Sequence, residues 1–324
     1  MRRTLVCAAV LSVFAAVVAP AVAVAAVCTP TALPGLPGVA LHEVTGTDYA
    51  GTYVARGTDA DGEVGVIWRD GQPSVLPGDV VPYDMNRSGV ISGSVSVEDF
   101  PSSYRSAVLV RPDGTITTLG TAYSTAAAGL NERGDAVGWY YPEHPVIHFA
   151  VVWPAGSTSY ETLDPSWYLP LDIDDNGFSV GKPQDPAQPQ RIWRLDGTVV
   201  WNYGPYPAGA SSLDLADIDD GKVAAKRTRP DGRFEVVLIS VATGAVTALP
   251  GSASGTPLEI ENGVLVGRGP QGATMWRSSG ATVLPAPAGL ATREATAVNG
   301  DGTEVAGISV TSSGDAVATV WRCS

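Results

Sequence analysis

The sequence predicts an all-β protein, a seven-bladed β-propeller with about four strands per blade. Three observations carry this prediction. A short pattern recurs seven times along the 324 residues, a strand missing at one end of the chain is present at the other, and the composition disfavours helices. Glycine (37) and proline (25) together make up about a fifth of the chain, and both residues break helices.

The recurring pattern is an apolar residue, then Asn or Asp, then a turn ending in Gly, then apolar residues and a second Gly. Three copies are complete, three are shortened, and the first, Val44-Thr45-Gly46 leading to Gly51, is degenerate. Such spacing is typical of repeat architectures. The copies begin at Val44, Met85, Leu130, Ile173, Ile218, Ile260 and Val298.

A second pattern runs in phase with the first. Each copy continues into an apolar run that usually ends in Trp, followed by a Gly turn and another short apolar run. Asp-Gly between apolar runs indicates a tight hairpin, because its turn requires positive φ. The residues that mark this phase are spaced 38 to 45 apart: Trp68, Val110, Trp153, Trp193, Leu238, Trp276 and Trp321.

Each unit therefore supplies about four short strands. A single sheet of this size leaves both faces and two edges unprotected, whereas radial stacking buries the faces between neighbouring sheets. We expect one propeller domain over residues 27–324, with units that begin near residues 40, 81, 127, 169, 215, 258 and 295.

The two ends of the chain complement each other. Only three residues follow Trp321, so the last unit lacks its closing strand, while Thr31–Pro34 reproduces the closing segment Thr282–Pro285 without a unit of its own. The N-terminal strand should therefore complete the last blade. Cys28 and Cys323 would then lie on paired strands, where a disulfide can form. Two free thiols, or a lipidated Cys28, are the alternatives.

Residues 1–26 are interpreted as an export signal peptide. Two arginines precede an apolar stretch and a small-residue cleavage site, and a membrane anchor is the alternative interpretation. After signal removal we expect no membrane span. A net charge of −13 disfavours nucleic acid as a partner. The prediction is a monomer that is secreted, extracellular or associated with the cell wall.

One unit resembles a known family. Leu119-Gly120-Thr121 leads to Ala128–Trp139, and His148–Trp153 follows. This arrangement is similar to the extracellular HAF-repeat proteins. The resemblance implies export and a propeller-like fold. It implies no defined activity and no site residues.

Candidate catalytic and metal motifs are weak. Asp172–Gly177 matches the first half of a calcium loop, but Pro183 stands where the loop requires a bidentate Glu, so we interpret these acids as turn residues. Three histidines offer no zinc motif, and no nucleophile elbow is present. We expect no cofactor and no metal. A carboxylate-dependent glycan hydrolase or lyase, with its site in the propeller funnel, is the alternative function.

Aromatic residues concentrate in residues 139–206, several in connections between strands. Connections between blades and between second and third strands share one rim of a propeller. Exposed rings there can stack on sugars or anchor a peptide, although packing of the blade tops is the alternative. The tentative binding residues are Tyr140, Tyr141, Trp167, Tyr168, Tyr203 and Tyr206. The predicted function is an exported, non-catalytic binding or interaction module whose ligand the sequence does not identify, with a cell-wall glycan or another exported protein as the candidates.

Overall fold

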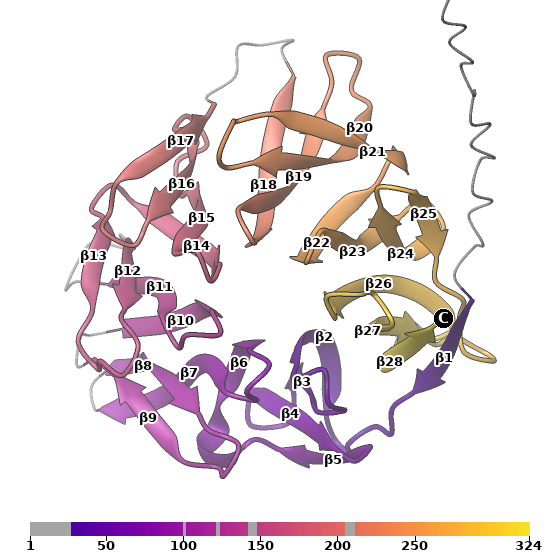
Figure 1. Ribbon diagram of the computed structural model, residues 1–324. Helices are drawn as coiled ribbons and strands as arrows, with labels where there is room; N and C mark the ends of the chain where they lie inside the picture. The colour runs from indigo at the N-terminus through magenta and orange to yellow at the C-terminus, as the bar shows by residue number, and fades with distance from the viewer. Residues whose placement is uncertain (1–26, 100–101, 121–123, 142–147, 205–210) are drawn as a thin grey trace, which may run out of the picture.

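The computed structural model describes residues 27–99, 102–120, 124–141, 148–204 and 211–324. These residues form seven four-stranded antiparallel sheets arranged in a ring (Figure 1). The predicted seven-bladed β-propeller is confirmed. The predicted signal peptide, residues 1–26, lies outside the described residues.

Blades 1 to 3 follow one another along the chain, and the first strand of each lies nearest the ring axis (Figure 1). Blade 1 consists of β2 (Ala40–Thr47), β3 (Tyr53–Thr58), β4 (Glu63–Arg69) and β5 (Gln72–Val75), and a 3-10 turn, η1 (Pro77–Asp79), follows it. Blade 2 consists of β6 (Val81–Met85), β7 (Ile91–Asp99), β8 (Ser102–Val110) and β9 (Ile116–Leu119). Blade 3 consists of β10 (Ser124–Leu130), β11 (Ala136–Tyr141), β12 (Phe149–Trp153) and β13 (Glu161–Asp164).

Blades 4 to 6 repeat this order. Blade 4 consists of β14 (Tyr168–Ile173), β15 (Phe178–Pro183), β16 (Gln190–Arg194) and β17 (Val199–Tyr203). Blade 5 consists of β18 (Ser212–Asp219), β19 (Lys222–Thr228), β20 (Phe234–Ser240) and β21 (Val246–Ala253). Blade 6 consists of β22 (Thr256–Glu261), β23 (Val264–Gly269), β24 (Gly272–Arg277) and β25 (Gly280–Val283). Within the described residues no helix is long and apolar enough to cross a membrane.

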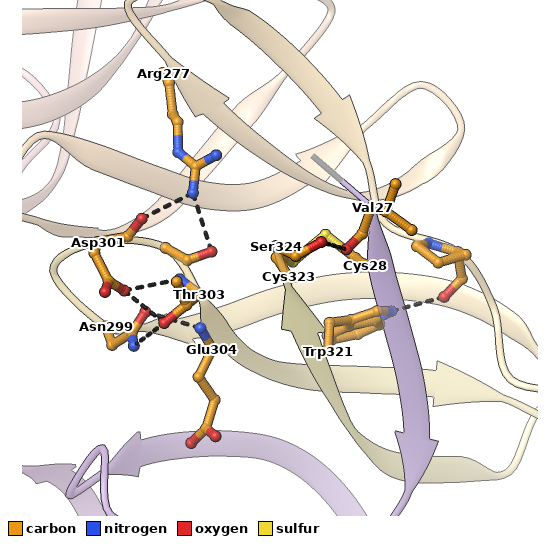
Figure 2. The surroundings of a disulfide bond; sticks show 12 residues. Val27, Cys28, Arg277, Asn299, Asp301, Thr303, Glu304, Trp321, Cys323 and Ser324 are labelled. Carbon is orange, nitrogen blue, oxygen red and sulfur yellow. Dashed lines mark hydrogen bonds between the residues drawn. A yellow bond between two sulfur atoms is a disulfide. The ribbon is translucent and has the colours of Figure 1, made fainter. Parts of the chain in front are cut away.

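Blade 7 is assembled from both ends of the chain. Its strands are β26 (Ala291–Val298), β27 (Glu304–Val310), β28 (Ala316–Cys323) and, as the outermost strand, β1 (Cys28–Ala32). Cys28 lies opposite Cys323 in the β1–β28 register, and a disulfide joins them (Figure 2). The predicted closure and the predicted bridge are both confirmed. Disulfides persist in oxidising compartments, which suits a location outside the cytoplasm.

The N-terminal segment also replaces a closing segment of the repeat. The indole N–H of Trp321 donates to the carbonyl of Pro285, 2.6 Å away, across the boundary between blades 6 and 7. The indole N–H of Trp68 donates to the carbonyl of Pro34, 2.8 Å away, across the boundary between blades 7 and 1. The two Leu-Pro segments therefore occupy equivalent places, as the sequence comparison predicts.

The spaces between blades are packed with apolar side chains. The five repeat-phase tryptophans, Trp68, Trp153, Trp193, Trp276 and Trp321, are at most 1% exposed. One core cluster illustrates the arrangement, since it joins Val66 and Trp68 of blade 1 to Ile308 and Val320 of blade 7. Because both faces of each sheet are covered, the strands contain runs of Val, Ile and Ala rather than alternating polar residues.

The second Gly of the repeat lies where two strands of one blade approach closely. A Cβ added at Gly138 on β11 would collide with the carbonyl oxygen of Ala126 on β10. Only glycine fits there, which explains why the pattern ends in this residue.

The first repeat copy is placed differently from the prediction. The β2–β3 turn is built around Asp48, whose carboxylate accepts the N–H groups of Ala50 and Thr52, both at 2.8 Å. Val44-Thr45-Gly46 lies within β2 instead. The copy is degenerate because Asp48 occupies the Asx position two residues after Gly46.

Candidate functional site

A cavity of about 460 Å³ lies on the axis of the ring, and every blade contributes to its lining. We call this cavity the channel. Its wall is formed by the first strands of the blades, which lie innermost in Figure 1.

A β-bulge recurs in the first strand of every blade. At each one the pairing with the second strand skips a residue, for example Tyr83 between Pro82 and Asp84. A bulge turns the skipped residue and its neighbour away from the regular alternation of faces. β2 and β26 each skip one further residue, His42 and Arg293. The other seven skipped residues, one from each blade, line the channel and form what we call the bulge layer: Thr45, Tyr83, Ala128, Leu171, Ala216, Leu258 and Thr296.

The residue after each bulge-layer residue belongs to a second layer, the acid layer. Four blades place a carboxyl group there, and the other three place Gly46, Gly129 or Ala297. The small residues leave space for the acids, since a Cβ on Gly129 would lie 2.6 Å from Oδ1 of Asp172. The four carboxyl residues are Asp84, Asp172, Asp217 and Glu259.

Three of these carboxyl groups join neighbouring blades. Asp84 accepts the backbone N–H of Leu130 at 2.8 Å, and Asp217 accepts that of Ile260 at 2.7 Å. Glu259 accepts the backbone N–H of Val298 at 3.4 Å. Each donor follows the acid-layer position of the next blade. A bulge leaves backbone groups without ladder partners, and these carboxyl groups satisfy them.

Burial in the channel raises the pKa of every acid-layer carboxyl group. The pKa of Asp84 rises to about 7 and that of Asp217 to about 6. The pKa values of Asp172 and Glu259 lie well above the usual range, for the same reason and through the nearby charge of Asp217. Asp172 also shares a side-chain hydrogen bond with Asp217. The layer therefore holds protons near neutral pH.

Tyr49 and Arg87 lie at the turn end of the channel. Arg87 of blade 2 forms an ion pair with Glu261 of blade 6, across the channel. Its guanidinium also lies 5.6 Å from the ring centroid of Tyr49, which adopts a left-handed φ of 57°. Burial raises the pKa of the Tyr49 hydroxyl. This end is therefore crossed by side chains.

The other end, where the first strands begin, we call the channel mouth. Tyr83 and Trp139 meet edge to face there, with ring centroids 5.8 Å apart. The Arg56 guanidinium lies 5.2 Å from the centre of the Tyr83 ring and forms an ion pair with Glu43. Half-buried aromatic rings beside charged groups can bind a ligand that is apolar on one side and polar on the other.

Three of the six aromatic residues predicted from the sequence lie in three different places. Tyr141 lies near the channel mouth, because its ring is 3.8 Å from that of His148, which in turn lies 6.2 Å from Trp139. Tyr140 stacks on Tyr160 at 4.9 Å and packs against the core between blades 2 and 3. Trp167 is 46% exposed, in the connection between blades 3 and 4.

The remaining three lie elsewhere. Tyr168 is fully buried, packs against Trp193 at 5.3 Å and donates its hydroxyl to the carbonyl of Pro189, so its ring is not on the rim. Tyr168 is the first residue of β14, the inner strand of blade 4, and its side chain is part of the core there. Tyr203 is half-buried beside Trp201, and Tyr206 lies outside the described residues.

From the sequence, Asp172 is interpreted as a turn residue, and neither the acid layer nor Tyr83 is identified. The acids stand two residues before the Asn, Asp or Glu of each copy, a column that also contains Gly and Ala. Aligning the copies at that column would have revealed four carboxyl groups at one structural position. Tyr83 stands alone in its column, so no repeat signal marks it.

In the Asp-rich segment at the end of β14, Asp174 stabilises the turn that leads into β15. Asp174 accepts the N–H of Phe178 at 2.8 Å and that of Gly221 in the next blade at 2.7 Å. Asp172 faces the channel instead. Among the described residues, no group of three His, Cys, Asp or Glu side chains is arranged to hold a metal ion.

No family model matches the chain, and no curated protein matches it either. The resemblance to HAF repeats therefore stays a prediction. Solved structures do match. They include a prolyl endopeptidase (TM-score 0.56, 10% identity, 87% of this chain and 50% of that one). A puromycin-hydrolysing peptidase of Mycobacterium tuberculosis also matches (0.55, 14%, 87% and 52%).

A third match is an acylaminoacyl peptidase of Pyrococcus horikoshii (TM-score 0.57, 11% identity, 88% of this chain and 51% of that one). The chain spans about half the length of each of these proteins. At these identities the likeness establishes the propeller fold alone.

Proposed function

We propose that the protein is an exported, non-catalytic binding module whose ligand docks at the channel mouth. The observation that carries this proposal is the pairing of Tyr83 and Trp139 at the opening of the 460 Å³ channel. Concave sites of a few hundred Å³ with aromatic walls and a few polar groups are typical of small-ligand binding.

The arrangement of the carboxyl groups favours binding over hydrolysis. Glycosidases hold two carboxyl groups about 5–10 Å apart, one on each side of the bond that is cleaved. Here Asp172 and Asp217 are joined by a hydrogen bond, and Asp84, Asp217 and Glu259 accept backbone N–H groups of the next blade. These acids connect blades, which accounts for them without catalysis.

A glycan is the ligand we favour, at the cell wall or in the surroundings of the cell. Aromatic rings stack on the apolar faces of sugars. Arg56 and Glu43 beside them can exchange hydrogen bonds with sugar hydroxyl groups. Another exported protein is the second ligand class, and the test below separates the two.

The test is a pull-down with cell-wall polysaccharide and with the exported protein fraction, using two matched Trp→Ala variants. Trp139→Ala removes a ring at the channel mouth, whereas Trp167→Ala removes an exposed ring on the blade 3–4 connection. We expect polysaccharide to bind, and Trp139→Ala alone to reduce binding at least tenfold. Binding that depends on Trp167 and not on Trp139 would contradict the channel mouth as the site.

A further inference from the structure

Two lysines share one carboxylate at the mouth end of blades 4 and 5. The carboxylate of Asp214, near the start of β18, lies 2.9 Å from Nζ of Lys182 on β15 and 3.4 Å from Nζ of Lys226 on β19. Burial acts to raise the pKa of Asp214, but the two ammonium groups hold that pKa below its usual value. The ionised carboxylate neutralises one of the two lysines, so this group keeps one positive charge in excess.

Two arginines share a second carboxylate in blade 5. Glu235 on β20 pairs with Arg227 at 2.5 Å and with Arg229 at 2.7 Å. Burial acts to raise the pKa of Glu235, but the two guanidinium groups hold it below its usual value. This group also keeps one positive charge in excess. The four cations form what we call the basic arc: Lys182, Lys226, Arg227 and Arg229.

The basic arc stands out in an acidic protein, since the chain has 33 acidic and 20 basic residues. Within the described residues, a carboxylate with two cationic partners occurs in only one further place, at Glu294 with Arg268 and Arg293. Arg268 stands near the end of β23 and Arg293 near the start of β26, so this third carboxylate also lies at the mouth end. Cations therefore outnumber carboxylates in each of these three groups.

The remaining described charges at this end of blades 4 and 5 nearly cancel. Arg191 pairs with Asp164, and Arg233 pairs with Asp231. Asp185 accepts a backbone N–H of its own turn at 2.9 Å and offsets part of the excess. A net positive charge remains on the basic arc, and an anionic group of a ligand would complement it.

The basic arc continues the channel mouth across blade 4. The ring of Trp139 lies 6.2 Å from that of His148, whose carbonyl accepts the side-chain N–H of Gln184 at 3.2 Å. Gln184 stands two residues after Lys182, and Lys182 is paired with Leu169, which lines the channel. One surface thus passes from the aromatic rings of blades 2 and 3 to the cations of blades 4 and 5, which follow one another in the ring (Figure 1).

We infer that the ligand is a glycan that carries carboxylate groups, built with uronic acid units. One sugar ring faces Tyr83 and Trp139, and the carboxylates of the following units lie on the basic arc. They lie there rather than in the channel, because the acid layer repels them where it is ionised. This inference rests on the proposed function and narrows its ligand to acidic glycans.

Two features favour a sugar acid over a simple anion. Each pair of cations in the basic arc already holds a carboxylate of the protein, which shows that this group fits between them. The half-buried ring of Phe234 lies 6.0 Å from Nζ of Lys226 and provides a further aromatic ring beside the cations. Sugar rings can stack on such a ring while their carboxylates meet the cations.

The experiment compares two oligosaccharides that differ in one group per sugar. β-1,4-linked glucuronic acid oligomers carry a carboxylate where glucose oligomers of equal length carry a hydroxymethyl group, and both are titrated into the purified protein by calorimetry. We expect the acidic oligomer to bind about tenfold more tightly at low salt. High salt should remove most of this difference, because it screens charges on the surface. Polyphosphate of similar charge serves as an anion without a sugar ring.

Two substitutions remove the excess charges of the basic arc. Lys226→Gln leaves Asp214 with one cation, and Arg229→Gln leaves Glu235 with one, so neither carboxylate loses its last partner. The double variant should keep the thermal stability of the wild type and lose about tenfold in affinity for the acidic oligomer, and each single variant about threefold. Affinity for the glucose oligomer should stay unchanged.

Lys222→Gln is the matched control. It removes the same charge from the other end of β19, where Lys222 lies 3.5 Å from the carboxylate of Asp220. Affinity for the acidic oligomer should change by less than about twofold, because this end faces away from the channel mouth. Trp139→Ala should weaken the binding of both oligomers.

The outcomes separate this inference from the proposed function. Equal affinity for both oligomers, with binding that depends on Trp139, overturns the carboxylate and leaves the binding module standing. Unchanged affinity in the Lys226 and Arg229 variants, or an equal loss in Lys222→Gln, overturns the basic arc as the site. Binding of polyphosphate as tight as that of the acidic oligomer overturns the sugar. If neither the oligomers nor polysaccharide bind, the proposed function falls as well.

Discussion

The same seven repeats build two regions, the cores between neighbouring blades and the central channel, and these regions differ in their content of polar groups. Between the blades, the repeat-phase tryptophans lie among apolar side chains, and equivalent positions carry similar residues. In the channel, the acid-layer positions carry Asp, Glu, Gly or Ala, and the four acid-layer carboxyl groups have no counter-ion within the described residues.

The difference shows where the ring is constrained. Close packing between sheets requires a similar shape at every boundary, so the repeats present apolar side chains there, Trp in five of them and Val110 or Leu238 in the other two. The channel has space on one side of every strand. Its residues can differ from blade to blade, and this freedom allows a site that is not sevenfold symmetric.

Removal of the disulfide should have the largest effect on stability. The bond closes a loop with a sequence separation of 295 residues, and the double variant Cys28→Ser/Cys323→Ser should lose about 2–5 kcal/mol of unfolding free energy. Denaturant titration measures this loss. Reducing agent should lower the stability of the wild type to the level of the variant and leave the variant unchanged. An equal response of both proteins would contradict the role of the bond.

A matched pair of tryptophan variants sharpens the contrast between the two regions. Trp193 is fully buried between blades and donates its indole N–H to Asp164 at 3.0 Å, so Trp193→Ala should cost about 3–5 kcal/mol. Trp139 is half-buried at the channel mouth, so Trp139→Ala should cost only about 1 kcal/mol. Similar losses in thermal unfolding would show that the mouth is part of the core.

The pH dependence of stability should reveal the acid layer. In an unfolded chain carboxyl groups titrate near pH 4, whereas Asp84 has a pKa of about 7 and Asp217 of about 6 in the fold. Between these values the folded protein holds more protons, so its unfolding free energy should fall as pH rises from about 4 to 7. We expect a difference on the order of 1–3 kcal/mol from the layer.

Other titratable groups also change the unfolding free energy with pH, so a control variant is needed to isolate the acid layer. Burial lowers the pKa of His148, so below pH 6.5 this residue makes the unfolding free energy rise with pH, opposite to the acid layer. Arg227 and Arg229 lower the pKa of Glu235 despite its burial, and the stability that this provides is lost below about pH 4.5. The double variant Asp84→Asn/Asp172→Asn isolates the acid layer. Its unfolding free energy should depend less on pH than that of the wild type. Parallel pH profiles would contradict the raised pKa values.

The sequence predicts the ring well because its signals are local and repeated. The tryptophan phase sets the number of blades, and the Leu-Pro segment near residue 33 identifies the strand exchanged between the ends. The channel is harder to predict. The bulge skips one residue in the pairing of β6 with β7, so the regular alternation of side chains along a strand does not predict that Asp84 faces the axis. The pairing of Tyr83 with Trp139 depends on two blades meeting.

The exchange of strands at blade 7 has a consequence for how the molecule is made. Blades 1 to 6 each arise from one uninterrupted stretch of chain, whereas β1 waits for a partner that is synthesised nearly three hundred residues later. A growing chain can therefore mature blade by blade but stays unlatched until its final strand arrives. The bond between Cys28 and Cys323 can therefore form only after β28 has been synthesised.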